Sequence, residues 1–204
     1  MKNYRFVLAS LSTALVWAAV SATAENLKVG DKLPMADAKM QNVDGKEVSI
    51  AGVAGKNGTL VVFTCNHCPF AKAWEKRISE LGAAAGKEGI GVIAINSNDP
   101  AAYAEDSYEN MQKHAKDAGF TFPYVVDATS EVAVAFGASR TPEVFLFDKD
   151  GKLVYHGAVD DNREAPQVTK TYLKDALTAV AAGKPVATSE TKAVGCGIKF
   201  RSKA

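Results

Sequence analysis

The sequence has few cysteines, and the usual metal and haem arrangements are missing from it. Only Cys65, Cys68 and Cys196 occur in 204 residues, fewer than a small secreted domain held together by several disulfides would have. There is no second Cys-x-x-Cys unit and no His-x-x-x-His unit, so a four-ligand zinc site is not expected. Residue 69 is proline, which excludes the Cys-x-x-Cys-His signature of covalent haem attachment. We therefore expect neither a metal nor another cofactor.

Excess charge and sequence repetition are also absent. The chain has 24 Lys and Arg against 23 Asp and Glu, a formal net charge of +1. Such a balance gives no indication of an electrostatic nucleic-acid partner. A length of 204 residues with 47% hydrophobic content is enough for one domain with its own core.

The N-terminus has the features of a secretory signal peptide. Lys2 and Arg5 precede a mostly apolar stretch over residues 6–20, and Ala22-Thr23-Ala24 resembles a small-residue cleavage site. The apolar stretch is short for a membrane span. We expect cleavage near Ala24, no stable membrane insertion afterwards, and a periplasmic or otherwise exported protein. The alternative is an uncleaved N-terminal anchor.

The segment Cys65-Asn66-His67-Cys68-Pro69 is predicted to lie between a buried strand over 59–64 and an amphipathic helix that continues to about residue 85. Two cysteines separated by two residues at the start of a helix can form a disulfide, and the helix N-terminus favours a thiolate. We expect Cys65 to be the more exposed thiol and the nucleophile, and Cys68 to resolve the mixed disulfide. His67 can add positive charge or a hydrogen bond to the thiolate; the alternative is a turn residue without a role.

The rest of the chain alternates between predicted strands and helices. A hairpin is predicted over 36–50, further strands over 90–95, 124–126, 143–147 and 152–157, and further helices over 101–118, 130–136 and 168–182. This order predicts an α/β sandwich with a mixed sheet. We divide the chain into a signal peptide over 1–24, one domain over 25–183 and an irregular tail over 184–204.

This order of elements, with Cys-x-x-Cys at the first helix and Thr-Pro before the last hairpin, resembles the thioredoxin superfamily. The leading hairpin and Phe136-Gly137-Ala138-Ser139-Arg140 are similar to its peroxiredoxin-like, or redoxin, branch, which includes periplasmic thiol–disulfide oxidoreductases. The resemblance covers about residues 29–182. It implies a thioredoxin-like three-layer α/β/α sandwich with a mixed central sheet and an added N-terminal β-hairpin.

The resemblance also implies roles for residues outside the motif. Thr141-Pro142 matches a cis-proline that faces the dithiol, with a preceding backbone edge that pairs with an extended substrate strand; an ordinary trans-proline is the alternative. Arg140 and Thr64 match residues that assist a peroxidatic thiolate. The peroxiredoxin pattern Pro-x-x-x-Thr-x-x-Cys is nevertheless broken, since position 60 is Leu and Thr64 lies four residues before Cys68.

The sequence therefore predicts an exported thiol–disulfide oxidoreductase that acts on protein thiols or disulfides or on a redox partner protein. One alternative is a thiol peroxidase that acts on peroxide. Another is a periplasmic Cu(I) chaperone with Cys65, Cys68 and His67 as soft ligands. The glycines beside Cys196 suggest a tail that exchanges with the active-site pair; an intermolecular bridge and an inert buried thiol are the alternatives.

Overall fold

The structure, a computed structural model, describes residues 27–201. The predicted signal peptide over 1–24 lies outside the described residues. Within the part that is described, no helix combines the length and the apolar character needed to cross a membrane.

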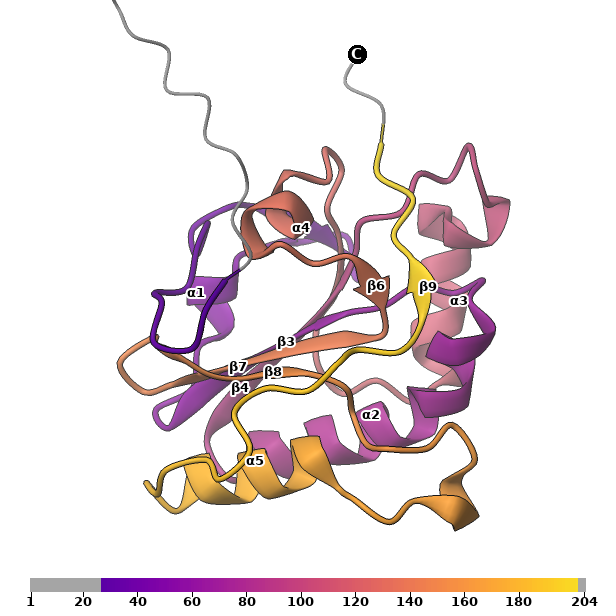
Figure 1. The fold of residues 1–204 in the computed structure, drawn as a ribbon. Helices are drawn as coiled ribbons and strands as arrows, with labels where there is room; N and C mark the ends of the chain where they lie inside the picture. The colour runs from indigo at the N-terminus through magenta and orange to yellow at the C-terminus, as the bar shows by residue number, and fades with distance from the viewer. Residues whose placement is uncertain (1–26, 202–204) are drawn as a thin grey trace, which may run out of the picture.

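A seven-stranded mixed sheet forms the middle layer, in the order β2-β1-β5-β4-β3-β7-β8. Figure 1 shows β3, β4, β7 and β8 of this sheet between α1 and α4 on one side and α2 and α5 on the other. The central strand β3 is parallel to β4 and antiparallel to β7. All six residues of β3 are buried, as expected for a continuous apolar run covered on both faces. The strands of this sheet are β1 (Met40–Asn42), β2 (Glu47–Val48), β3 (Gly58–Phe63), β4 (Ile90–Asn96), β5 (Tyr124–Val126), β7 (Glu143–Asp148) and β8 (Leu153–Gly157).

Helices cover both faces of the sheet. Successive residues of β3 point to opposite faces, so its side chains contribute to both cores. Leu60 and Val62 pack in one core with residues of α2 and α5, whereas Val61 and Phe63 pack with residues of α1 and α4. The helices are α1 (Ile50–Val53), α2 (Pro69–Lys87), α3 (Tyr108–Asp117), α4 (Glu131–Phe136) and α5 (Tyr172–Ala181), with 3-10 turns η1 (Ala104–Asp106) and η2 (Ala165–Gln167). The expected three-layer α/β/α sandwich is confirmed, with β1 and β2 as the added hairpin.

Two predicted helices are shorter than expected. The helix predicted over 101–118 is divided into η1 and α3, because the Ser107 side chain accepts a hydrogen bond from the Asn110 N–H and caps a new helix there. The helix predicted over 168–182 begins only at Tyr172. Pro166 lies in η2 instead, in a separate turn before it.

The segment after α5 is ordered by pairing with the domain. The His156 N–H donates to the Ser189 carbonyl at 3.0 Å, and the Thr191 N–H donates to the His156 carbonyl at 2.9 Å. Further on, β9 (Cys196–Gly197) pairs antiparallel with β6 (Arg140–Thr141) in a second, two-stranded sheet. Figure 1 shows β9 beside β6 at one end of the central sheet. The tail expected to be irregular therefore continues the fold of the domain.

Candidate active site

Cys68, not Cys65, occupies the N-terminus of helix α2. Cys68 is the N-cap residue, and Pro69 stands at the first helical position, where its missing N–H costs no hydrogen bond. The expectation that the helix N-terminus stabilises a Cys65 thiolate is wrong, since Cys65 lies three residues before the cap. The helix dipole favours negative charge on Cys68 instead.

Cys65 and Cys68 are both almost completely buried, with 1% and 0% of their surfaces exposed, so Cys65 is not the exposed thiol that the sequence predicted, and exposure does not distinguish the two. Burial raises the pKa of Cys65 to about 11, and the nearby Asp106 carboxylate adds to the increase; a hydrogen bond with Thr141 opposes it. The Cys65 Sγ and the Thr141 Oγ1 are 3.1 Å apart. Cys65 is therefore held as a neutral thiol at neutral pH.

The disulfide of this structure joins Cys68 to Cys196, across 128 positions of sequence and with 6.1 Å between the Cα atoms. Cys65 is free. The expected Cys65–Cys68 bond is thus not the one observed, because β9 brings Cys196 to the cap of α2. The three cysteines belong to one cluster, in which Cys65 and Cys68 pack with Ala71 and with the half-buried Cys196.

The Thr141-Pro142 peptide bond is cis, as the resemblance implied. Thr141 lies directly against the sulfur cluster: besides its contact with Cys65, its carbonyl oxygen is 3.4 Å from the Cys68 Sγ. The backbone edge of Thr141 is taken by β9, with Thr141 opposite Cys196 and Arg140 opposite Gly197. The predicted substrate edge is therefore filled by the chain itself.

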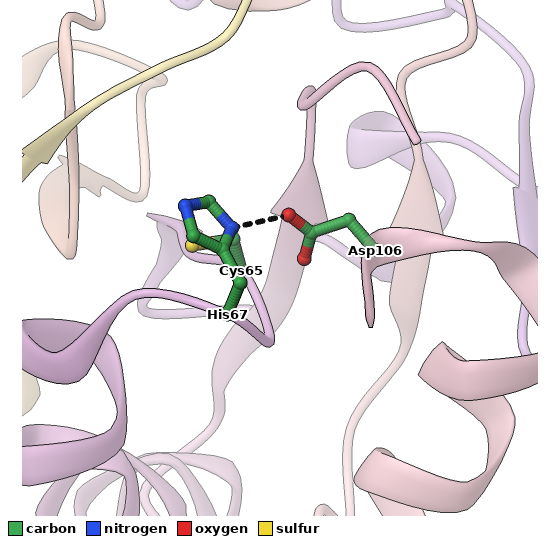
Figure 2. Close-up of side chains that lie close together, drawn as sticks. All are labelled: Cys65, His67 and Asp106. Atoms are coloured by element: carbon green, nitrogen blue, oxygen red, sulfur yellow. Dashed lines mark hydrogen bonds and ion pairs between the residues drawn. The ribbon is translucent and has the colours of Figure 1, made fainter. Parts of the chain in front are cut away.

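The His67 side chain is fixed by an acid that sequence reasoning did not identify. Its Nδ1 lies 2.5 Å from an Asp106 carboxylate oxygen, and its ring stacks on Tyr103 with 3.7 Å between centroids. Figure 2 shows the imidazole turned toward Asp106, with Cys65 behind the ring. His67 thus has a definite hydrogen-bond partner, unlike a turn residue that points into solvent.

Asp106 is buried and is held by amide donors. Its Oδ1 accepts from the Asn66 N–H at 2.7 Å and from the Asn96 side chain at 3.1 Å, and its Oδ2 accepts from the Asn98 side chain at 3.0 Å. The only sequence signal was the polar run that begins with Asn96, at the carboxyl end of a buried strand, where α/β sheets commonly place ligands. The surrounding Ala104-Glu105-Asp106 is typical of an exposed turn.

A second buried acid, Glu143, supports the cis-proline loop. Its Oε2 accepts from the backbone N–H groups of Ser139 at 2.8 Å and Arg140 at 3.0 Å. Its Oε1 lies 2.7 Å from the His156 Nε2. A carboxylate at the start of an apolar strand was a signal of this role, because a buried charge requires partners.

The two residues expected to assist a peroxidatic thiolate lie differently. Thr64 is buried next to Cys65, and its backbone N–H donates to the Ile95 carbonyl. The Arg140 side chain is exposed, and its Nη1 donates to the Gly195 carbonyl at 3.0 Å. The arginine therefore holds the tail beside β9.

Potential metal donors also meet in this region. Ligand atoms of Cys65, His67 and Asp106 lie within 4.8 Å of one another. The soft set expected for Cu(I), in which Cys65 and Cys68 act together with His67, is divided by the Cys68–Cys196 bond.

Comparisons with known proteins agree with this fold. The Redoxin family model matches residues 28–175. A thiol-disulfide oxidoreductase named ResA from Geobacillus thermodenitrificans is 28% identical over 160 residues, which cover 74% of this chain and 86% of ResA. The crystal structure of an uncharacterized conserved protein from Geobacillus kaustophilus is 38% identical with a TM-score of 0.81, covering 87% of this chain and 95% of that one. A thioredoxin-like protein in its oxidized form, 20% identical with a TM-score of 0.60 and covering 75% of this chain and 97% of that one, shares the fold.

Proposed function

Since the chain belongs to the Redoxin family, we propose that it is an exported thiol–disulfide oxidoreductase that works through Cys68 and Cys65. The observation that carries the proposal is the Cys68–Cys196 disulfide, which lies beside cis-Pro142 with the free thiol of Cys65 in the same cluster. The similarity to ResA supports the same reaction. The partners are protein thiols and disulfides or a redox partner protein, and the features of residues 1–24 support export.

The proposed order of events exchanges the roles expected of the two active-site cysteines. The Cys68 thiolate, favoured by the N-terminus of α2, attacks one sulfur of a substrate disulfide; the substrate S–S bond breaks, its other sulfur leaves as a thiolate, and a mixed disulfide with Cys68 forms. Cys65 then attacks the Cys68 sulfur, a Cys65–Cys68 disulfide forms, and the substrate cysteine leaves as a thiolate. In the oxidising direction the same steps run backwards, so the reaction balances without a cofactor.

His67 and Asp106 support the step that Cys65 performs. Cys65 must lose its proton to attack, and a His67 ring nitrogen within 4.8 Å of its sulfur is at a distance that one bridging water can span. The buried Asp106 carboxylate holds the ring in this orientation through its contact with Nδ1. Asp106 acts through His67 and is a positioning residue.

The test is disulfide exchange with a model peptide, followed by thiol trapping and mass spectrometry. Cys68→Ser is expected to abolish exchange, whereas Cys65→Ser combined with Cys196→Ser, which removes both thiols that could resolve the bond, is expected to accumulate Cys68 in mixed disulfides. Accumulation of mixed disulfides on Cys65 in the Cys68→Ser protein would restore the order predicted from the sequence. Absence of exchange in the wild type would contradict the function. A reduction potential of about −120 mV for the Cys65–Cys68 pair would identify an oxidant, and one of about −270 mV would identify a reductant.

The Cys68–Cys196 bond also favours one second function, a thiol peroxidase. Peroxide would convert the Cys68 thiolate to a sulfenic acid, and Cys196 would condense with it to the observed disulfide and release water. Arg140 is directed at Gly195 instead of a cysteine sulfur, which favours disulfide exchange. Oxidation of reduced protein by peroxide much faster than by a peptide disulfide would reverse this preference.

A further inference from the structure

We propose that Gly195-Cys196-Gly197 is a built-in substrate: it occupies the peptide site on the edge of β6, and that site accepts cysteine only when glycine precedes it. This inference rests on the proposed function and adds the class of substrate, an extended segment that contains Gly-Cys. It also adds regulation, since an external substrate has to displace β9.

The backbone of the tail is bound as a strand on both sides of the captured cysteine. Cys196 lies opposite Thr141 in the antiparallel pair of β6 and β9. The Ile198 N–H donates to the Ser139 carbonyl at 3.0 Å in a main-chain bond, and the Arg140 side chain adds a bond from its Nη1 to the Gly195 carbonyl. Main-chain pairing of this kind supplies affinity without reading side chains.

Selectivity arises at the residue before the cysteine. A Cβ added to Gly195 would lie 2.1 Å from the Thr141 carbonyl oxygen and 2.7 Å from its carbonyl carbon. These are backbone atoms next to cis-Pro142, so they cannot move aside like the end of a flexible side chain. A Cβ on Gly197 would meet nothing closer than 3.9 Å. The site therefore requires glycine before the cysteine and tolerates a side chain after it.

Contacts on each side keep the tail beside Cys68 when the disulfide opens. Before β9, the Thr191 Oγ1 lies 2.7 Å from the Tyr155 hydroxyl and accepts from the Ala158 N–H at 2.9 Å. After β9, Ile198 is buried in the main core, and the Lys199 N–H donates to the Asn98 side chain at 2.8 Å. Such tethering gives Cys196 a high effective concentration at the site, against which any external substrate competes.

Release of the tail uses the chemistry already described. The Cys65 sulfur, after losing its proton, attacks the Cys68 sulfur; the Cys68–Cys196 bond breaks, and Cys196 leaves as a thiolate that takes up a proton. One disulfide and one thiol are present before and after the step, so no external oxidant or reductant is consumed. The raised pKa of Cys65 keeps this release slow at neutral pH.

The first experiment compares Gly195→Ala with Gly197→Ala in the full-length protein. Thiol trapping in glutathione buffers measures the equilibrium constant of the Cys68–Cys196 bond. Because overpacking against fixed backbone is unfavourable, Gly195→Ala is expected to lower this constant at least about tenfold. Gly197→Ala is the matched control and is expected to stay close to the wild type. Equal effects of the two substitutions, or no effect of either, would overturn the proposal.

A second variant and a second probe separate this result from misfolding and from failure of the function itself. Arg140→Ala, at an exposed position, is expected to weaken the bond severalfold by removing the hydrogen bond to Gly195. Cys196→Ser protein is then given the peptides Thr-Gly-Cys-Gly and Thr-Ala-Cys-Gly as mixed disulfides with glutathione. We expect the mixed disulfide between peptide and Cys68 to form at least about tenfold faster with the glycine peptide than with the alanine peptide. Equal rates with both peptides would overturn the substrate class alone. If neither peptide forms a mixed disulfide with Cys68, and the wild type also shows no disulfide exchange, the proposed function is overturned.

Discussion

At the scale of single residues, the site depends on a difference between two neighbouring thiols. Both are buried, but Cys68 caps a long helix and is bonded to Cys196, whereas Cys65 lies beside Thr141 with a raised pKa. Both sulfurs come from one five-residue motif, but only Cys68 lies at the helix N-terminus, where the dipole stabilises negative charge. We infer that Cys68 is suited to carry a mixed disulfide and Cys65 to end it.

The raised pKa of Cys65 leads to a prediction about its reactivity. In the oxidised protein Cys65 is the one free thiol. With a pKa of about 11, against an unperturbed 9.0, it should react with iodoacetamide at pH 8 about 100-fold more slowly than in the unfolded chain, because each pKa unit changes the thiolate fraction tenfold. Asp106→Asn removes a nearby negative charge and should speed the reaction. Mass spectrometry of the alkylated peptide gives the rate, and a Cys65 that reacts as fast in the folded as in the unfolded protein would contradict this picture.

The same pKa predicts how stability changes with pH. The folded protein keeps the Cys65 proton to higher pH than the unfolded chain does, so the stabilisation is complete below about pH 9 and is lost as the pH rises toward 11. The free energy of unfolding of the oxidised wild type should therefore fall more steeply over this range than that of Cys65→Ser. Urea unfolding at several pH values measures both, and parallel curves would refute the assignment.

At the scale of elements, the tail and the cis-proline loop support each other. Glu143 fixes the backbone of Ser139 and Arg140, and this backbone provides the edge that β9 uses. Earlier in the tail, residues 189–191 pair with the edge of β8. The open edges of both strands are therefore covered by the same segment, which also protects them from pairing with other chains.

The anchor at Thr191 provides a test of how the tail is held. Thr191→Val keeps the shape of the side chain and removes the contacts with Tyr155 and Ala158. Loss of these hydrogen bonds should weaken the docked tail by about 1–3 kcal/mol and increase amide hydrogen exchange of Ile198. Thr178→Val, which removes an exposed bond within α5, is the matched control. Unchanged exchange in Thr191→Val would show that β9 is held without this anchor.

At the scale of the whole molecule, the Cys68–Cys196 bond joins the centre of the fold to its last described segment. Closing a loop of this length restricts the unfolded chain, which is worth about 4–5 kcal/mol in the chain-entropy treatment. A Cys65–Cys68 bond closes a loop so short that little stabilisation follows. The redox states therefore differ in stability as well as in chemistry.

We expect oxidised wild type to be more stable than Cys196→Ser by a few kcal/mol, up to about 4–5. Wild type reduced with dithiothreitol should match Cys196→Ser, because neither contains the long-range bond. Chemical unfolding with fluorescence detection measures the three free energies. Equal stability of the oxidised wild type and Cys196→Ser would show that the bond adds nothing to the native state.

The sequence by itself determined the fold class and the location of the chemistry. The apolar run of β3, the helical spacing in α2 and the Asn-Val-Asp-Gly hairpin turn are local patterns, and each element forms close to where its pattern predicts. The cis bond at Thr141-Pro142 followed from the resemblance in element order.

Only the tertiary structure decided which cysteine bonds to which, and which acids belong to the site. Cys196 lies 128 positions from Cys68, and Asp106 and Glu143 reach the motif from two other segments of the chain. Such pairings depend on how strands and loops meet in space, and local periodicity carries no information about them. The burial of both Cys65 and Cys68 has the same cause, since the elements that cover them come from distant parts of the sequence.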